Sequence, residues 1–223
     1  MWNKIQRIYV GTQRVRPSER LPSAYKEVEW IWRNGNNYID TWWTPNLSNT
    51  FEVRIGYKIA DSGYRYGILS NYNWSNKSVS FELNSGSQTW NKARFYIENS
   101  GNNMDLFSST AVSTSTFSDV VYKSTTSTKK VSVNWTESSL SNSITWTNNT
   151  TAYLFIDRGL RWTTFSHNSF ISYCQIYESW TLVKDFVPCY RKSDSVIWLY
   201  DLVNDVFYTN KGGWTFSKWP DVN

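Results

Sequence analysis

The stretch Phe170–Tyr208 contains four apolar runs separated by short polar breaks. The runs are rich in β-branched and aromatic residues, which are typical of strands. The pattern predicts consecutive antiparallel strands. We expect Pro188 to end the second ladder, because proline has no amide hydrogen to donate. The four runs are Phe170–Tyr177, Leu182–Val187, Val196–Leu202 and Val206–Tyr208.

Alternating side chains earlier in the chain indicate further strands. In Thr50–Ile59 the apolar residues alternate with Glu52, Arg54 and Lys58, which predicts a strand buried on one face. Arg14–Pro22 is expected to be an extended linker, and the Ser/Thr-rich segment Ser108–Thr128 is either a solvated outer strand or a loop. Further strands are expected at Trp2–Val10, Tyr25–Trp32, Asn37–Thr41, Tyr66–Tyr72, Val79–Leu83, Ala93–Ile97, Lys129–Trp135, Ile144–Thr147 and Thr151–Ile156.

These segments add up to about a dozen short strands, with no sustained helical periodicity and no fixed repeat. Such a pattern predicts an all-β fold, an antiparallel jelly-roll β-sandwich. A chain of 223 residues is compatible with one such domain. No apolar run is long enough for a membrane-spanning helix, and the first residues lack the apolar core of a signal peptide, so we expect no membrane partner.

The two cysteines, Cys174 and Cys189, do not fit one disulfide. A hairpin turning near Ser179-Trp180 places Cys174 opposite residue 185. Cys189 then lies about 13 Å further along the strand, which is too far for a bridge. We therefore expect two free, packed thiols.

The positive charge is concentrated at the N-terminus. Residues 1–20 carry five basic residues and one acid, a net charge of +4, whereas the whole chain carries +5. This division predicts an arm at 1–20 followed by a domain at 21–223. Such an arm could bind nucleic-acid phosphates, but we favour docking on an acidic protein surface. The interleaved apolar residues indicate a strand rather than a disordered tail. The residues expected to make that attachment are Ile5, Arg7, Ile8, Tyr9, Arg14 and Arg16.

Catalytic and metal-binding patterns are weak. His167 is the only histidine and has no triad-like neighbours in sequence. Glu27 and Glu29 have the spacing of a carboxylate pair but lack a third acid, so we expect no enzyme activity. No Cys/His cluster or calcium loop predicts a cofactor or metal, although a single structural calcium held by loop carbonyls stays open.

Aromatic residues in or beside the expected loops are candidates for sugar binding. Their rings can stack on the apolar face of a pyranose while Asn, Asp and Ser orient the hydroxyl groups. The alternative for each ring is packing in the core or between protomers. The candidates are Trp42, Trp43, Tyr64, Tyr66, Tyr72, Trp74 and Trp90.

Two phrases carry a family resemblance. RLPSAYKEVEWIWRNGNNYIDTWWTPN and TLVKDFVPCYRKSDSVIWLYDLVNDVFYTN resemble the signatures of concanavalin A-like (laminin-G-like) jelly-roll domains in tailed-bacteriophage structural proteins. The resemblance implies a virion protein of the fibre, tail or head-decoration type, assembled in the host cytoplasm and attached to other virion proteins through the arm. The domain would bind a host-surface glycan or a neighbouring subunit. A purely structural subunit and a glycan-degrading enzyme remain alternative functions, and a homo-oligomer stays open as the state of assembly.

The chain departs from the resembled pattern where that pattern has glycine. Tryptophan stands at five of these positions, and the chain has 14 Trp against 10 Gly. Either the tryptophans are genuine, or UGA codons have been read under the wrong genetic code and the native protein carries glycine. The positions are Trp42, Trp180, Trp198, Trp214 and Trp219.

Overall fold

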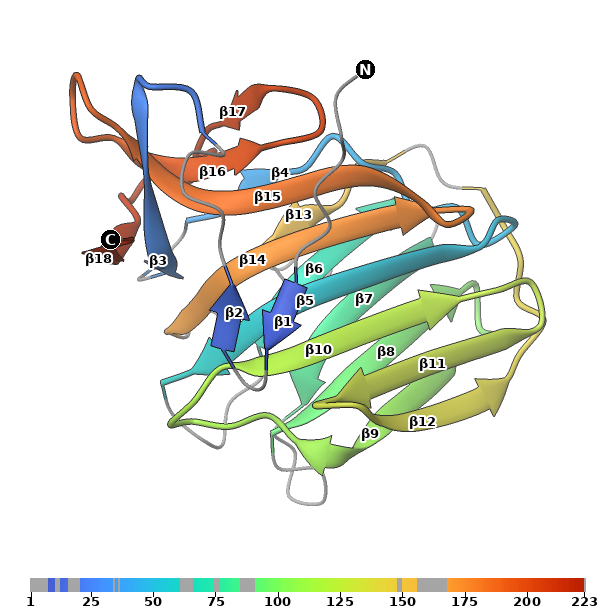
Figure 1. The fold of residues 1–223 in the computed structure, drawn as a ribbon. Helices are drawn as coiled ribbons and strands as arrows, with labels where there is room; N and C mark the ends of the chain where they lie inside the picture. Colours follow the sequence, from blue (N-terminus) through green and yellow to red (C-terminus); the bar gives the residue numbers. More distant parts are fainter. Residues whose placement is uncertain are drawn as a thin grey trace.

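The computed structural model describes residues 8–10, 13–15, 21–33, 35, 37–60, 66–73, 77–84, 91–147, 150–155 and 168–222. Within these ranges the regular secondary structure consists of strands, without any helix. Two antiparallel sheets pack face to face, and Figure 1 shows the larger sheet in front of the smaller one. The predicted all-β jelly-roll sandwich is confirmed.

The larger sheet has ten strands. Its interior strand β5 (Phe51–Ile59) pairs with β10 on one side and β14 on the other, although these strands are far apart in sequence. Across the sheet the order is β12 (Thr136–Ser141), β11 (Thr128–Val133), β10 (Ser118–Ser124), β5, β14 (Ser169–Glu178), β3 (Tyr25–Arg33), β15 (Thr181–Arg191), β16 (Ile197–Asp201) and β17 (Val206–Tyr208), with β18 (Ser217–Asp221) paired to β3.

The smaller sheet has six strands and lies behind the larger one (Figure 1). Its order is β4 (Ile39–Asp40), β13 (Tyr153–Leu154), β6 (Tyr66–Asn73), β7 (Lys77–Asn84), β8 (Lys92–Asn99) and β9 (Met104–Ala111). A separate two-stranded hairpin is formed near the N-terminus by β1 (Ile8–Val10) and β2 (Gln13–Val15).

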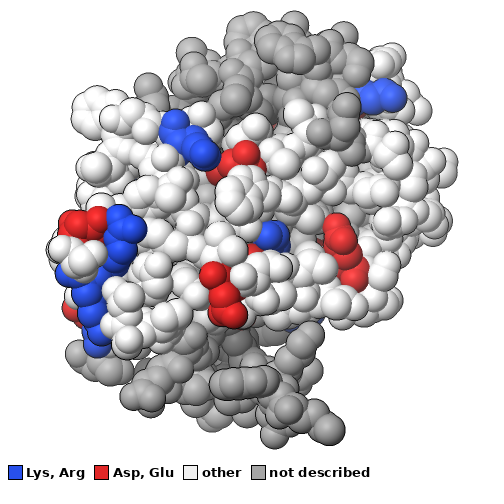
Figure 2. Space-filling view, turned by 90° about the horizontal axis from the view of Figure 1, so that it is seen from above, with Lys and Arg blue, Asp and Glu red and all other residues white. Residues whose placement is uncertain are grey.

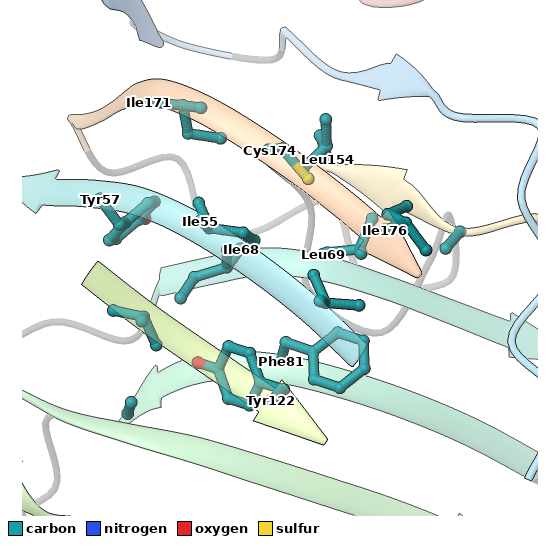
Figure 3. Packing of buried hydrophobic residues seen from close by; sticks show 14 of the residues in the cluster. Ile55, Tyr57, Ile68, Leu69, Phe81, Tyr122, Leu154, Ile171, Cys174 and Ile176 are labelled. Atoms are coloured by element: carbon teal, nitrogen blue, oxygen red, sulfur yellow. The ribbon is translucent and has the colours of Figure 1, made fainter. Parts of the chain in front are cut away.

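The core fills the space between the two sheets. Because successive side chains of a strand point to opposite faces, the odd-numbered residues of β5, among them Ile55 and Tyr57, all point inward. Figure 3 shows Phe81 and Tyr122 packed beside them, and the rings of these two residues are 4.7 Å apart. Burying one such large side chain stabilises the fold by about 1.5–3 kcal/mol relative to leaving it in water.

The Ser/Thr-rich segment Ser108–Thr128 forms strands rather than a loop alone. It contains β10, which lies inside the larger sheet and buries every second residue. Val120 and Tyr122 supply the buried positions, and the Tyr122 hydroxyl donates a hydrogen bond to the Glu82 carbonyl (3.2 Å). Regular alternation over seven residues is therefore sufficient for a strand inside the sheet, even within a Ser/Thr-rich segment.

The prediction that Pro188 ends the ladder is wrong. β15 continues through Pro188, which pairs with Leu199 of β16. On the opposite side of β15, the pairing with β14 ends at Phe186 and the pairing with β3 begins at Cys189. The proline lies in the gap between these two partners, so its missing amide hydrogen interrupts neither ladder.

Other boundaries also differ from the prediction. Arg14 belongs to strand β2 and not to a linker, because the hairpin returns immediately after β1. The segment 144–147 forms no strand, yet Ile144 and Trp146 are buried where the chain crosses over the core. Thr151–Ile156 contributes only the two-residue strand β13. Residues 1–7 of the expected first strand lie outside the described residues.

The cysteine geometry follows the predicted hairpin. Cys174 pairs with Phe186, one residue from the expected partner, and both cysteines are free and buried. Burial raises the pKa of the Cys189 thiol well above its usual range, and the charge of Glu27 adds to the shift. The thiol form therefore predominates at neutral pH.

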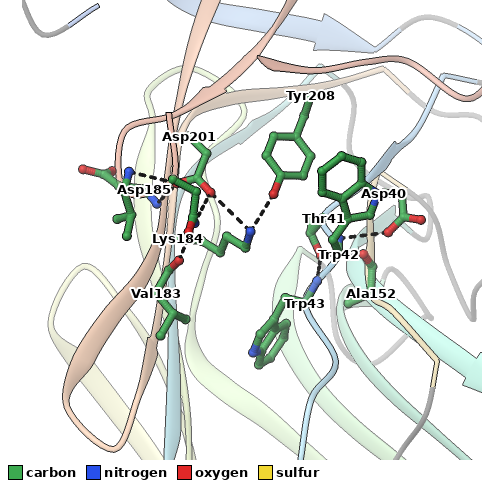
Figure 4. Close-up of polar contacts among 12 residues, drawn as sticks. Asp40, Thr41, Trp42, Trp43, Ala152, Val183, Lys184, Asp185, Asp201 and Tyr208 are labelled. Atoms are coloured by element: carbon green, nitrogen blue, oxygen red, sulfur yellow. Dashed lines mark hydrogen bonds and ion pairs between the residues drawn. The ribbon is translucent and has the colours of Figure 1, made fainter. Parts of the chain in front are cut away.

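A buried polar network connects β15, β16 and β17 (Figure 4). The Lys184 ammonium lies 3.3 Å from the fully buried carboxylate of Asp201 and donates to the Tyr208 hydroxyl (2.5 Å). Asp201 also accepts hydrogen bonds from the backbone amides of Asp185 and Val203 and from the Asn204 side chain (3.1, 3.1 and 2.7 Å). The carboxylate thus holds together three successive segments of the chain.

Three exposed tryptophans adopt the left-handed backbone that favours glycine. Asn134-Trp135 joins β11 to β12, and Ser179-Trp180 joins β14 to β15. Both residues of each loop have positive φ, with 72° at Trp135 and 71° at Trp180, as in a type I′ turn. Trp42 has a φ of 54°. Left-handed geometry costs an ordinary L-residue roughly 1–2 kcal/mol.

The left-handed backbone of these tryptophans bears on the hypothesis that some positions are misread codons for glycine. Trp42 and Trp180 are among the five positions where the resembled pattern has glycine, and their backbone fits glycine. Trp198 and Trp219 lie within strands β16 and β18, where the backbone makes no such demand. Trp135 also has a left-handed backbone, although it is not one of the five positions at which the resembled pattern has glycine.

We expect Trp135→Gly to stabilise the protein by about 1 kcal/mol, because the relief of left-handed strain exceeds the entropy that glycine loses on folding. Trp180→Gly should raise the stability by less, because it also removes the contact of the Lys123 ammonium with the Trp180 ring (3.9 Å). Thermal unfolding of both variants checks this. Trp135→Ala is the matched control because it removes the ring but keeps the strained backbone. Equal stability of the Gly and Ala variants would rule out backbone strain as the cause.

Candidate functional site

A groove of about 190 Å³ lies on the outer face of the larger sheet. It crosses β14, β5, β10, β11 and β12, which lie toward the viewer in Figure 1. Polar and charged side chains line it, together with Val121 and two aromatic residues, Tyr173 and Trp135. The other lining residues are Glu52, Arg54, Asp119, Lys123, Lys130, Ser132, Glu137 and Gln175.

Strand register brings these residues together. The inward positions of β5 fill the core, so Glu52 and Arg54 point to the opposite face. On β10, Lys123 pairs with Glu52 and Val121 pairs with Arg54. On β14, Gln175 pairs with Arg54. The floor of the groove therefore consists of side chains from three neighbouring strands.

Gly56 allows one aromatic ring to lie close to the sheet. A Cβ atom at this position would come within 2.6 Å of the Tyr173 ring and 2.2 Å of the Ser172 hydroxyl. The register shifts in β14 between Ile171 and Tyr173, and the bulge turns the Tyr173 side chain onto the outer face. Its hydroxyl donates a 2.6 Å hydrogen bond to Asp119, which fixes the ring at the end of the groove.

Ion pairs connect most charges in the groove. Glu52 contacts Arg54 and lies 3.7 Å from the Lys123 ammonium, and Lys130 is 2.7 Å from Glu137. Burial disfavours the charge of Arg54, but the hydrogen bond and negative charge of Glu52 outweigh it and raise the pKa of the guanidinium. These contacts hold the polar side chains of the groove in fixed positions.

Aromatic rings flank the charged floor. The Arg54 guanidinium lies 5.0 Å from the centre of the Tyr177 ring, and the Lys123 ammonium lies 3.9 Å from that of Trp180. Trp135 stands on the rim with 80% of its surface exposed. The groove thus combines flat apolar rings with hydrogen-bonding groups.

The described lining of the groove includes none of the seven aromatic residues selected from the sequence. Trp42 is 57% exposed and packs against Tyr208, with ring centres 4.8 Å apart. Trp43 and Tyr66 are in the core, at 4% and 2% exposure, so their rings have no free face for a sugar. Tyr64, Trp74, Trp90 and the Tyr72 side chain lie outside the described residues.

The sequence feature that points to this groove is the polar face of Thr50–Ile59, which was not among the candidate sites. Glu52 and Arg54 were recognised as the outward residues of a half-buried strand. Their neighbours Val121 and Gln175 are distant in sequence, and only the strand register places them alongside.

The expected attachment residues are described only in part. Ile8 pairs with Val15, and Tyr9 pairs with Arg14, in the β1–β2 hairpin. Ile5, Arg7 and Arg16 lie outside the described residues. A role for 1–20 in attachment, and the division at residue 20, therefore stay predictions.

The described residues also bear on metal sites, membrane spans and nucleic-acid surfaces. In this part of the chain no group of three or more His, Cys, Asp or Glu side chains is placed to hold a metal ion. None of its segments is a helix long and apolar enough to cross a membrane. In the face shown in Figure 2, the described charges of both signs lie interspersed among neutral residues. This mixture differs from the one-sign surface typical of nucleic-acid binding.

No known family profile matches the chain, and no curated protein matches it in sequence. Solved structures do match its fold. The CBM40 of the Ruminococcus gnavus IT-sialidase, determined with α2,3-sialyllactose bound, has a TM-score of 0.53 at 15% identity, covering 69% of this chain and 90% of that chain.

Two further structures are similar. A candidate carbohydrate-binding protein from Bacteroides ovatus has a TM-score of 0.57 at 10% identity, covering 88% of this chain and 62% of that chain. A mutant of the NanB sialidase from Streptococcus pneumoniae has a TM-score of 0.51 at 13% identity, covering 71% of this chain and 27% of that chain. At these identities the similarity shows the fold, a β-sandwich of the same kind.

Proposed function

We propose that this protein is a glycan-binding β-sandwich and that the groove over β14, β5, β10, β11 and β12 is its binding site. The observation that carries the proposal is the composition of the groove: the ring of Trp135, which is 80% exposed, stands beside donors and acceptors held by ion pairs on one sheet face. Sugars require this combination, because a pyranose has an apolar face and a rim of hydroxyl groups.

The groove offers both kinds of hydrogen-bonding partner. Arg54 and Lys123 supply donors, and Glu52 and Asp119 supply acceptors. Gln175 can serve as both, and its amide already donates to Asp185 (3.2 Å), which fixes its orientation. A sugar hydroxyl can donate and accept at once, so paired donors and acceptors suit it better than a surface of one kind.

The carboxylates of the groove favour binding over hydrolysis. Glu52 is held by Arg54 and Lys123, Glu137 by Lys130, and Asp119 accepts the Tyr173 hydroxyl. A glycosidase needs a pair of carboxyl groups that flank the scissile bond and act on it, whereas each carboxylate of this groove is already engaged by a neighbouring side chain. These contacts fit a lectin-like role.

Structural neighbours support a glycan as ligand. The CBM40 structure from R. gnavus contains sialyllactose, and the B. ovatus protein is described as a candidate for carbohydrate binding. Fold alone does not determine function, so the composition of the groove is the main support for the proposal and the neighbours add to it.

The finer role that we propose is that of a bacteriophage virion protein of the fibre, tail or head-decoration type. The arm at 1–20 attaches the protein to other virion proteins, and the domain at 21–223 contacts the host surface. The basis is the resemblance of the two sequence phrases given above. The alternative is a purely structural decoration or fibre subunit, in which the groove contacts a neighbouring protomer.

A glycan array with intact protein and with protein lacking residues 1–20, run beside a virion-incorporation assay, tests both roles. We expect both proteins to bind the same glycans and only the intact protein to enter particles. Circular dichroism of the shortened protein checks that the domain still folds. Arm-dependent incorporation without any glycan signal would support the structural alternative instead.

A further inference from the structure

We infer that the groove takes a neutral glycan and discriminates against sialylated or otherwise anionic sugars. This inference rests on the proposed function, since it specifies the ligand of the same groove. It differs from what the CBM40 neighbour suggests, because the sialyllactose in that structure carries a carboxylate.

The charges that line the groove cancel. Three cationic side chains face three anionic ones, so the described lining has a net charge of zero. The cations are Arg54, Lys123 and Lys130, and the anions are Glu52, Asp119 and Glu137.

Each of the cations already has an anionic partner. Glu52 forms ion pairs with both Arg54 and Lys123, and Glu137 forms one with Lys130. A ligand carboxylate that approached Arg54 would meet Glu52 at the same place and would have to displace it. The Glu52 side chain is only 9% exposed, so it cannot swing into solvent without losing its packing.

Neutral hydroxyl groups face no such conflict. They can donate to Glu52 and Asp119 and accept from Arg54 and Lys123 without breaking an ion pair. An anionic sugar instead loses its own hydration and gains no free cation in return. Charge cancellation therefore selects against acidic ligands, while the aromatic rings serve both classes equally.

Matched pairs of the same glycan core, printed with and without a terminal sialic acid, test this with the full-length protein. We expect the neutral member to bind about tenfold more tightly, and its affinity to change little with salt. Tighter binding of the sialylated member overturns the inference but leaves the proposed function intact. Binding to neither member of any pair overturns both.

Variants that remove the anionic partner of a cation test the same inference. Two such variants are used, so that a folding defect in one does not decide the result. Glu52→Gln frees Arg54 and Lys123, and Glu137→Gln frees Lys130 at a side chain that is 49% exposed. Each substitution should shift the preference toward the sialylated member by roughly three- to tenfold. Glu29→Gln, at an exposed position of β3 outside the groove lining, changes the total charge equally and should leave the preference unchanged. An unchanged preference in both groove variants contradicts the electrostatic basis of the inference.

Discussion

Asp201→Ala is expected to lower the free energy of unfolding by about 3 kcal/mol, because it removes one half of a buried ion pair. The Lys184 ammonium, 13% exposed, loses its only described carboxylate at salt-bridge distance. The backbone amides of Asp185 and Val203 and the Asn204 side chain lose their acceptor as well. Buried donors without a partner carry the full cost of desolvation.

Two further variants separate the ion pair from the hydrogen bonds. Asp201→Ala combined with Lys184→Met removes the unpaired charge and should recover part of the loss in a double-mutant cycle. Asp194→Ala removes a carboxylate whose pair with Arg191 (2.5 Å) is exposed, and we expect no change in melting temperature. If Asp201→Ala melts at the same temperature as Asp194→Ala, the buried network does not stabilise the fold.

Lys129→Met is expected to raise the free energy of unfolding by about 2 kcal/mol at neutral pH. Lys129 lies at an inward position of β11, and its side chain is buried. Burial lowers the pKa of its ammonium from 10.5 to about 8. Its one described polar contact is the Thr125 carbonyl, which accepts a hydrogen bond from the ammonium (2.5 Å).

The pH dependence of this gain follows from the lowered pKa. Below the folded-state value both states are protonated, and the wild type bears the full cost of a buried charge. Between about 8 and 10.5 the folded state loses its proton first, so the wild type gains stability as the pH rises. The advantage of Lys129→Met should therefore shrink across this window.

Chemical denaturation of wild type and variant at a series of pH values measures that difference. Lys130→Met is the matched control, because Lys130 is partly exposed and pairs with Glu137. It should show no comparable gain at neutral pH. A gain for Lys129→Met that stays constant up to pH of about 11 would mean that the lysine charge is not its source.

Apolar periodicity predicts much of the larger sheet. The runs between Phe170 and Tyr208 became β14, β15, β16 and β17, and the predicted partner of Cys174 was one residue from the observed Phe186. Two-residue turns between apolar runs fix the register locally, so neighbouring strands can be read from one sequence.

Strands with few apolar residues are not predicted by apolar periodicity. β12 (Thr136–Ser141) is polar and exposed almost throughout, and it is held by pairing to β11 rather than by burial. β18 (Ser217–Asp221) likewise joins β3 with little burial. The segment 144–147 shows the converse case, since Ile144 and Trp146 are buried without a ladder.

The groove could not be predicted for a related reason. Its floor joins residues of β5, β10 and β14, and Arg54 pairs with Val121 on one side and Gln175 on the other. These pairings cross the whole chain and depend on sheet order, which local patterns do not encode. The aromatic residues chosen from the sequence were selected for their loop context, and Trp43 and Tyr66 proved to be buried.

The identity of the tryptophans at the glycine-like positions has a direct test. The backbone at Trp42 and Trp180 is left-handed. A genuine tryptophan adopts this conformation at an energetic cost, whereas glycine adopts it freely. The intact mass of protein from the native host distinguishes the two. A mass equal to that of the printed sequence excludes the misread codons, and a lower mass by whole Trp-to-Gly steps supports them.

The claim that the groove binds a glycan is tested most directly by isothermal titration of a glycan selected on the array. Wild type is compared with Ser132→Trp, which places a large ring in the groove, and with Ser193→Trp, a matched change at an exposed turn outside the groove lining. We predict that Ser132→Trp abolishes binding while Ser193→Trp binds like the wild type. Unchanged affinity in folded Ser132→Trp protein would contradict the assignment of the site.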